Sequence, residues 1–564
     1  MFIRNSIFHS FCVSKTASQG ILHFFVISLL GLALVGHAVR AQDGHHSGHS
    51  MGTVKFSVSC SEKAQSEFDQ ALLFLHHMTY PQAQVAFEKA AATDPNCAMA
   101  QWGIAMTLFQ PLWPTRPKPD ALQRGWDALQ KAKTLKSSER ELMFIGAAEA
   151  FFLEPASTDY WLRIRRWEQA SQKVYAALPD DPEASVFYAL SHLATTPSNV
   201  ISRGHADLAA GILLKVYKQN PDHPGAMHYL VHANDVPGRE NELLEITRKY
   251  ESAAPRNPHA LHMPTHIYTR LGDWDAVVRG NLRAAEAALE HPAGPKGEYV
   301  WDEFPHAIEY LVYAHLQKGA DDKAAEQLKR LLQTERLEPS FKTAFHISST
   351  QARYALERRA WKEAQSLAVR EPANLDWDRF TWPEAITQFA RGLGAAYLAK
   401  TGEARQAVRR LDELEAATQK AGEELFARNI KVMRLELSSW IAQSQGEKLT
   451  ALALMREAAA VETSTPKHAV TPGPTLPAYE QLGELLMEHK QPTEALAAYK
   501  QSLERYPKRF NSLLGAARAA KAAGDKAAAR AYYQQLFEVA GSGSRRTEIK
   551  EAKSYAEPSP NVRR

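Results

Sequence analysis

The chain has 564 residues and a formal net charge of +4, with 67 basic residues against 63 acidic ones spread along its length. This balance creates no extended basic field, so neither nucleic acid nor an acidic membrane surface is expected as a partner. Alanine, leucine and the long charged and amide residues dominate, whereas alternating runs of valine, isoleucine and threonine are scarce. We therefore expect an all-α fold.

The N-terminus has the features of a secretory signal peptide. Arg4 and Lys15 precede an apolar stretch over residues 21–39, and residues 39–41 offer small side chains at the positions that a signal peptidase reads. We expect residues 1–41 to be removed and the mature protein to be periplasmic or secreted. The apolar stretch, about 19 residues long, would also suit an uncleaved membrane anchor, which is the one membrane contact we expect.

Residues 42–56 form a short His-rich segment. It contains His45, His46, His49 and Met51 within a few positions of one another. Such a tract captures copper or zinc in some proteins, and the alternative is an accidental flexible linker.

Two cysteines remain beyond the signal peptide, Cys60 and Cys97. Each lies near the start of one of two successive parallel helices. In an oxidising compartment a disulfide bond between them is expected, with two buried thiols as the alternative.

Two stretches at opposite ends of the chain share one spacing of aromatic and small residues. The C-terminal stretch has Tyr479, Leu482, Gly483, Leu486, Ala495, Tyr499 and Pro507. The N-terminal stretch has Phe74, Ala83, Phe87, Ala90 and Pro95, followed by Met99, Trp102, Gly103 and Met106. Both resemble the tetratricopeptide repeat (TPR) family. The resemblance implies a TPR-like α-solenoid, a right-handed superhelix of antiparallel helix pairs, with a concave groove that binds peptides or partner proteins.

Degenerate copies of this spacing extend over most of the chain. We expect a helical array over 57–465, a linker over 466–476, a C-terminal TPR pair over 477–540 and a disordered tail over 541–564.

Three segments in the middle of the array begin with proline and reach a glycine fourteen residues later. They are Pro224 to Gly238, Pro258 to Gly272, and Pro305 to Gly319. Proline suits the first turn of a helix and glycine its end, so each segment is expected to form the first helix of a repeat. The first two begin 34 positions apart, the period of a TPR.

These segments carry a ladder of histidines, within a region of about 182–319. His228 and His232 are four residues apart in the first segment, and His262 and His266 occupy the same places in the second. Side chains four residues apart stack on one helix face, and helices packed 8–10 Å apart would let all four imidazoles converge. The register predicts that they face the groove and are accessible.

Other polar side chains continue the same register, and we assign them hypothetical roles. Glu309 and Tyr313 take the places of the two histidines in the third segment, and Asp235 follows His232. We expect these three to act as catalytic groups, as ligand, general base or hydrogen-bond donor. Arg270, His259 and His306 are expected to bind substrate, with Arg270 anchoring negative charge.

Three interpretations of the ladder stay open: structural histidines copied with the repeat, a transition-metal site, and a metal-free site for an anionic or hydroxylated ligand. We favour the metal site, with copper or zinc ahead of iron, because neutral imidazoles at this spacing suit these ions. The ladder lacks the His-Glu-x-x-His pattern of thermolysin-like peptidases. No nucleotide- or haem-binding motif occurs either, so neither cofactor is expected.

Whether the protein is an enzyme stays open. A metal-dependent enzyme would act on a small molecule or peptide held in the groove. The alternative is a non-enzymatic scaffold of the cell envelope that holds a protein partner there without metal.

Overall fold

The computed structural model describes residues 51–157, 159–294, 296–541 and 543–556. Within these ranges the secondary structure is almost entirely α-helical, which confirms the all-α expectation. The one sheet in the described part of the chain is antiparallel and pairs β1 (Pro292–Ala293) with β2 (Tyr299–Val300). Among the described helices, none combines the length and the apolarity that crossing a bilayer requires.

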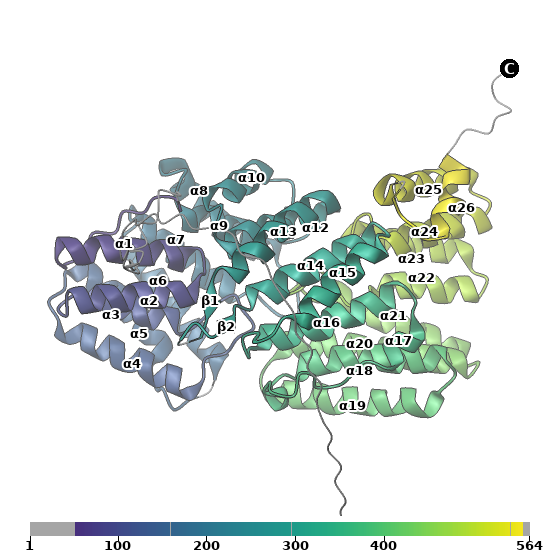
Figure 1. Ribbon diagram of the computed structural model, residues 1–564, viewed down its shortest axis with the longest axis horizontal. Coiled ribbons are helices and arrows are strands. Elements are labelled where there is room, and N and C mark those ends of the chain that lie inside the picture. The colour runs from purple at the N-terminus through teal and green to yellow at the C-terminus, as the bar shows by residue number, and fades with distance from the viewer. Residues whose placement is uncertain (1–50, 158, 295, 542, 557–564) are drawn as a thin grey trace, which may run out of the picture. The chain divides into compact units, whose positions relative to one another are not determined.

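The helices form successive antiparallel pairs, and each helix contacts the one that follows it in the chain (Figure 1). The first helices of the pairs are α1 (Glu62–His76), α3 (Ala98–Thr107), α5 (Glu139–Phe152), α7 (Pro182–Ala194), α9 (Pro224–Asn234), α11 (Pro258–His262) continued by α12 (Pro264–Leu271), α14 (Glu303–Gln317), α16 (Phe341–Glu357), α18 (Thr381–Tyr397), α20 (Glu424–Ser444), α22 (Ala478–Glu488) and α24 (Phe510–Ala522). The second helices are α2 (Tyr80–Thr93), α4 (Pro119–Thr134), α6 (Tyr160–Ala177), α8 (Arg203–Gln219), α10 (Leu244–Ala253), α13 (Trp274–Leu289), α15 (Asp321–Gln333), α17 (Trp361–Gln365), α19 (Thr401–Lys420), α21 (Lys448–Ser464), α23 (Pro492–Arg505) and α25 (Lys526–Ala540). A short 3-10 helix (Trp377–Arg379) precedes α18, and α26 (Glu548–Ala556) follows α25.

The repeat spacing noted in the sequence corresponds to close helix contacts. A Cβ atom added to Gly103 on α3 would lie 2.2 Å from the ring of Phe87 on α2. One added to Gly483 on α22 would lie 2.7 Å from the ring of Tyr499 on α23. Glycine is thus required where a neighbouring aromatic ring touches the helix backbone. These contacts, repeated at both ends of the array, make the chain a TPR-like solenoid.

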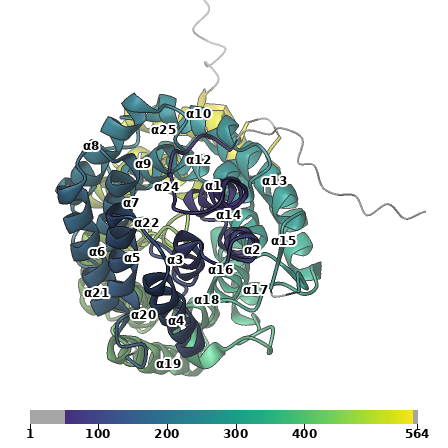
Figure 2. The same ribbon diagram turned by 90° about the vertical axis from the view of Figure 1, so that its left-hand side faces the viewer.

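The first helices lie on the inside of the array and the second helices on the outside. Figure 2 shows α9, α12 and α14 inside α8, α10, α13 and α15. Burial follows the same division: every residue of α14 is buried, whereas α15 buries only Ala324, Gln327 and Leu331. Side chains on α9, α11, α12 and α14 therefore point into the interior of the solenoid.

Proline and side-chain caps define the helix starts of the ladder region. Proline occupies the first turn of α9 and of α11, where its missing N–H costs nothing. His223 Nδ1 accepts from the backbone N–H of Ala226 at 3.3 Å, and Asn257 Oδ1 accepts from that of Ala260 at 3.0 Å. Gly272 ends α12 with a left-handed φ of 63°.

The three expected ladder helices differ from the sequence prediction in their bounds. The middle one is broken into α11 and α12 because Pro264 has no N–H to donate within the helix. The helix expected to start at Pro305 starts two residues earlier, at Glu303. The helix that starts at Pro224 ends at Asn234, before Gly238.

The expected disulfide bond is present between Cys60 and Cys97, whose Cα atoms are 4.8 Å apart. It ties the segment before α1 to the residue before α3.

Three segments predicted to be unstructured make specific contacts instead. Residues 51–56 pack against the array: Phe56 is 1% exposed, and the carbonyl oxygen of Met51 is hydrogen-bonded to His77 Nε2. The predicted linker 466–476 is partly buried, because Arg353 holds its backbone carbonyls. In the predicted disordered tail, helix α26 packs on α25 through Ile549 and Ala552. The rest of the His-rich tract, with His45, His46 and His49, lies outside the described residues.

Candidate metal centre

Three of the four ladder histidines are buried and His232 is half-buried, which corrects the prediction of an accessible groove face. His228 and His262 are 0% exposed and His266 is 1% exposed. Two non-helical segments cover the inner face of these helices. The loop 108–118 places the ring of Trp113 5.3 Å from that of His259, and in segment 466–476 Lys467 Nζ lies 2.7 Å from Asp235 Oδ2. The covering segments lie more than a hundred residues from the ladder in sequence.

Six histidines gather here as two groups of three, which replaces the predicted single group of four. The first triad, His228, His232 and His259, comes from α9 and α11. The second triad, His262, His266 and His306, comes from α11, α12 and α14. Within each triad, one ring nitrogen from each residue lies within 4.8 Å of the other two. His259 and His306, predicted to bind substrate, are thus placed beside the predicted metal ligands.

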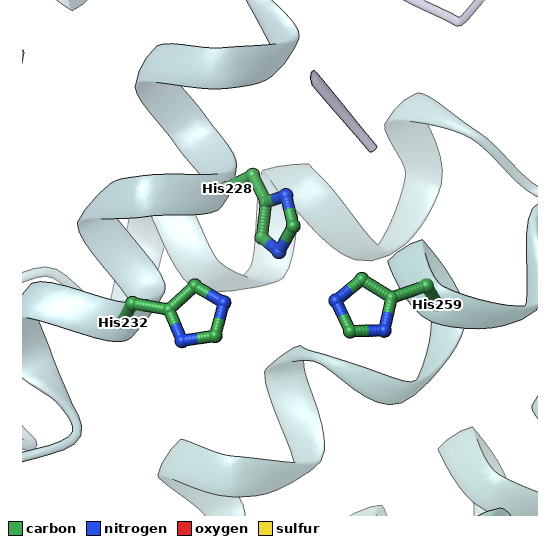
Figure 3. A group of neighbouring side chains, drawn as sticks. All are labelled: His228, His232 and His259. Atoms are coloured by element: carbon green, nitrogen blue, oxygen red, sulfur yellow. The ribbon is translucent and has the colours of Figure 1, made fainter. Parts of the chain in front are cut away.

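In the first triad the three imidazoles face a common space (Figure 3). The Nε2 atoms of His228, His232 and His259 are all buried, and none has a hydrogen-bond partner among the described residues. A buried polar atom without a partner costs about 1–3 kcal/mol. Three such atoms face one space, where a single partner would contact all of them.

Hydrogen bonds made by Nδ1 orient two of these rings so that Nε2 faces the shared space of the triad. His228 Nδ1 donates to the carbonyl oxygen of His76 at 2.7 Å, and His259 Nδ1 donates to Glu303 Oε2 at 3.1 Å. A neutral imidazole has one N–H, so the Nε2 atom of each carries a lone pair. Burial by itself would raise the pKa of Glu303, but Lys342 and His259 lower it below the usual range. A carboxylate behind an imidazole is the usual support for a metal ligand.

In the second triad, His262 Nε2 and His266 Nε2 are 2.9 Å apart. His262 Nδ1 lies 2.7 Å from Asn281 Oδ1, and His266 Nδ1 lies 2.9 Å from Asp235 Oδ2. The ring of His306 is 4.1 Å from that of His262, centroid to centroid. Its Nδ1 atom is buried and has no partner within the described ranges.

Asp235 and Arg270 support the second triad from outside. The carboxylate of Asp235 accepts from His266 Nδ1, Arg270 Nε and Lys467 Nζ. Burial favours the neutral acid, but these cations hold the pKa of Asp235 well below its usual range. Asp235 therefore positions the His266 ring, and Arg270 in turn binds the Asp235 carboxylate.

Glu309 and Tyr313 lie away from both triads. Glu309 accepts from His346 Nδ1, Ser349 Oγ and Arg353 Nε, which occupy both of its oxygens. The hydroxyl of Tyr313 accepts from Arg509 Nη1 at 3.0 Å. The prediction for Glu309 and Tyr313 is therefore wrong. It assumed that positions counted from Pro305 match those counted from Pro224 and Pro258, which carry the histidines.

Tyr310 and His346 border the second triad and were not predicted from the sequence. The ring of Tyr310 is 4.7 Å from that of His262, and the ring of His346 is 4.6 Å from that of His306. The Tyr310 hydroxyl and His346 Nε2 are buried, and neither finds a partner in the part of the chain that the structure describes. Tyr310 follows His306 by four residues, and this spacing was the available signal.

Burial keeps most of these imidazoles neutral. It lowers the pKa of His266 to about 4, because the interior disfavours the imidazolium ion. Burial lowers the pKa values of His228, His232, His262 and His306 well below the usual range, and a neighbouring histidine lowers each further. Neutral imidazole is the form that binds metal ions.

Two cavities adjoin the triads. The smaller, of about 20 Å³, has room for about one water-sized sphere and is lined by histidines of both triads together with Trp113 and Val470. The larger, of about 210 Å³, is bordered by His232 and Asp235 on one side. Its wall combines apolar side chains such as Trp161 and Trp382 with charged ones. His232 borders both cavities, so the larger one adjoins the first triad.

A third group, His76, Glu183 and His223, has a different character. Glu183 Oε2 is 2.9 Å from His76 Nε2, and Glu183 Oε1 is 3.1 Å from His223 Nε2. His76 Nδ1 is hydrogen-bonded to the Tyr229 hydroxyl, and His223 Nδ1 caps α9. Each ring nitrogen has a partner, so this group is explained as a structural network joining α1, α7 and α9.

Neither a family model nor a curated protein sequence matches this chain. Similar solved structures include a human IFIT1 dimer with PPP-AAAA, at 13% identity and a TM-score of 0.37, covering 75% of this chain and 87% of that one. The APC/C hetero-tetramer Cut9-Hcn1 is 13% identical with a TM-score of 0.29, covering 87% of this chain and 96% of that one. At these TM-scores neither likeness bears on the function of the chain.

Proposed function

We propose that this protein binds a transition-metal ion through His228, His232 and His259 and uses it as a metal-dependent enzyme on a small molecule held in the adjoining cavity. The observation that carries the proposal is the convergence of three buried Nε2 atoms without partners in the first triad. A three-histidine set leaves coordination positions open for a substrate, as catalytic sites require. A bound ion supplies Lewis-acid or redox chemistry there.

The chemistry of the donor set limits the choice of metal. Imidazole nitrogens are the only inward-facing donors of the first triad, and the nearby carboxylate of Glu303 faces the outer side of His259. Such a set suits copper, zinc, iron or nickel, whereas magnesium and calcium prefer oxygen ligands. Copper or zinc remains our first choice.

The larger cavity supports a small-molecule substrate. Trp161, Trp382 and Met433 offer apolar contact area, and Arg270 and Lys467 place positive charge on the side of His232. Apolar walls with a few convergent polar groups are typical of ligand sites. We expect a small organic molecule that carries an oxygen-rich or anionic group.

The alternative, a metal-free scaffold that grips a peptide, has less support. Segments 108–118 and 466–476 of the chain itself cover the inner face of the ladder helices. A peptide partner would have to displace them from α9, α11 and α14.

Export to an oxidising compartment is part of this proposal. The signal features lie outside the described residues, and the support is the disulfide bond between Cys60 and Cys97. Intact-mass measurement of the expressed protein tests it: a chain beginning near residue 42 is expected, and a reduced, uncleaved chain would contradict it.

Metal analysis of the full chain, purified without a polyhistidine tag, tests the site. We expect the double variant His228→Gln, His259→Gln to lose the metal of the first triad and to keep its helical circular dichroism. The matched control is His315→Gln, which changes a buried histidine of α14 that belongs to neither triad. Equal metal content in the double variant and the control would refute the proposal.

A further inference from the structure

The second triad contains two ring nitrogens whose positions neutral imidazoles by themselves do not explain. His262 Nε2 and His266 Nε2 are 2.9 Å apart, a distance that normally means a hydrogen bond. A hydrogen bond needs one N–H and one lone pair. The partners of the two Nδ1 atoms decide which nitrogens carry the protons.

For His266 the proton belongs on Nδ1. Its partner is a carboxylate oxygen of Asp235, which also receives Arg270 and Lys467 and therefore stays ionised. An ionised carboxylate only accepts hydrogen bonds. His266 Nδ1 must donate, and its Nε2 is left with a lone pair.

For His262 the proton belongs on Nδ1 as well. Its partner is Asn281 Oδ1, and the orientation of that amide is set because Asn281 Nδ2 donates to the carbonyl oxygen of Val277 at 2.9 Å. Reversing the amide would place its oxygen against the carbonyl oxygen of Val277, so that two acceptors would face each other. His262 Nδ1 therefore donates, and its Nε2 also carries a lone pair.

Two lone pairs thus face each other at 2.9 Å in a buried site. This arrangement is repulsive unless a positive species lies between them. Two nitrogen ligands at 2.0–2.1 Å from one metal ion are about 2.9 Å apart at the right angle of square-planar or octahedral coordination, and about 3.3 Å apart at the tetrahedral angle. The observed separation is that of two cis ligands of a single ion.

Further unpaired groups surround the same point. A ring nitrogen of His306 completes the set within 4.8 Å, and His306 is 4% exposed. Its Nδ1 atom and the Tyr310 hydroxyl are both buried with no partner in the described ranges. The second triad therefore has the ligand number of the first, together with a phenol at its edge.

We infer that His262, His266 and His306 bind a second transition-metal ion beside the first, so that the centre is dinuclear. The inference deepens the proposed function and rests on it, because it places the second ion next to the first triad. The rings of His232 and His266 are 6.4 Å apart, as are those of His259 and His262. Four of the six histidines line the 20 Å³ cavity, His232, His259, His266 and His306.

A dinuclear centre narrows the substrate class. Two ions about 3.5–4 Å apart hold one small group of a substrate between them. The group must fit a space of about 20 Å³ that lies beside His232, which also borders the larger cavity. We therefore expect the substrate to be a small molecule whose carboxylate or phosphoryl oxygen binds the two ions.

Titration with Co(II), followed by its visible absorption, tests the inference on the full chain after chelator treatment. Every protein carries His45→Ser, His46→Ser and His49→Ser, so that the N-terminal tract contributes no binding. We expect the double variant His262→Gln, His266→Gln to bind one equivalent fewer than this background protein. The His315→Gln control is expected to keep the full number.

The outcomes separate this inference from the proposed function. One equivalent in the background protein, unchanged in the His262→Gln, His266→Gln variant, overturns the second ion and leaves the first site standing. No binding in the background protein overturns both, and a proton shared by His262 and His266 then explains their contact. If the double variant loses its helical circular dichroism, His306→Gln replaces it, with the same expected loss of one equivalent.

Discussion

Two histidine groups in neighbouring repeats use their ring nitrogens in opposite ways. In the group of His76, Glu183 and His223, every ring nitrogen has a partner. In the first triad, three buried Nε2 atoms face one another with no partner among the described residues. Both groups are buried and both bring three side chains together. The partners of the ring nitrogens, rather than clustering or burial, distinguish the structural network from the proposed metal site.

The two groups are also joined physically. The carbonyl oxygen of His76 accepts from His228 Nδ1, and a Cβ atom on Gly225 would lie 2.5 Å from His76 Nδ1. Helix α1 thus packs directly on the start of α9, and this contact aims His228 Nε2 at the first triad. We expect the structural group to control stability and the triads to control metal binding.

The largest effect is expected for Glu183→Ala. It leaves His76 Nε2 and His223 Nε2 buried without their partner, so the free energy of unfolding should fall by about 3–5 kcal/mol. Urea denaturation followed by circular dichroism measures the loss. The metal content of the folded fraction should stay at the wild-type value.

Glu183→Gln is the matched control for this change, because its amide oxygen still accepts one hydrogen bond. A smaller loss of stability is expected. If Glu183→Ala removed metal without lowering stability, the assignment of the two groups would have to be exchanged.

An intermediate effect is expected for Glu303→Gln. The change removes the carboxylate that accepts from His259 Nδ1, while Lys342 keeps its contact with Asp302. Loss of such a support weakens metal affinity by about 10–100-fold. Competition with a chromophoric chelator measures this affinity.

Glu436→Gln is the control for Glu303→Gln. Burial raises the pKa of Glu436, and the side chain borders the larger cavity and neither triad, so its substitution should leave metal affinity unchanged. An equal loss in both variants would mean that the carboxylate of Glu303 has no specific effect on His259.

The smallest effect is expected on the pH dependence of stability, through His315. This buried histidine belongs neither to the structural group nor to a triad. Burial lowers its pKa to about 4, with Lys323 and Lys318 adding to the shift. The unfolded chain therefore binds an additional proton between about pH 6.5 and pH 4. The free energy of unfolding therefore begins to fall near pH 6.5, and this loss is complete below about pH 4.

The His315→Gln variant lacks this titration. Between pH 7 and pH 5 the metal-free variant should lose about 1–2 kcal/mol less stability than the wild-type chain. Denaturation curves at both pH values provide the comparison. Identical losses would show that the folded pKa of His315 is close to its unfolded value.

Part of the candidate site could be predicted from the sequence because it is local. A spacing of four places His228 above His232, and the 34-residue offset places the second pair on the neighbouring helix. The regrouping into two triads was not predictable in this way. It depends on how α9, α11, α12 and α14 pack together, which places His259 and His306 beside the four predicted histidines.

Burial of the site was beyond the reach of sequence patterns for a different reason. Trp113 and Lys467 come from segments that carry no repeat signature, and only the winding of the solenoid brings them over the ladder. Proline and glycine in these segments indicated breaks in the array, without showing where the chain between the breaks would lie.

The sequence by itself determined the helical repeat, the nearness of the two cysteines and the presence of a histidine-rich inner face. Each of these follows from spacing along one or two adjacent helices, where geometry is set by the backbone. The tertiary structure decided which imidazoles meet, which nitrogens keep a free lone pair and which segments exclude water. Those properties depend on contacts between repeats far apart in the chain, whose distances no local periodicity encodes.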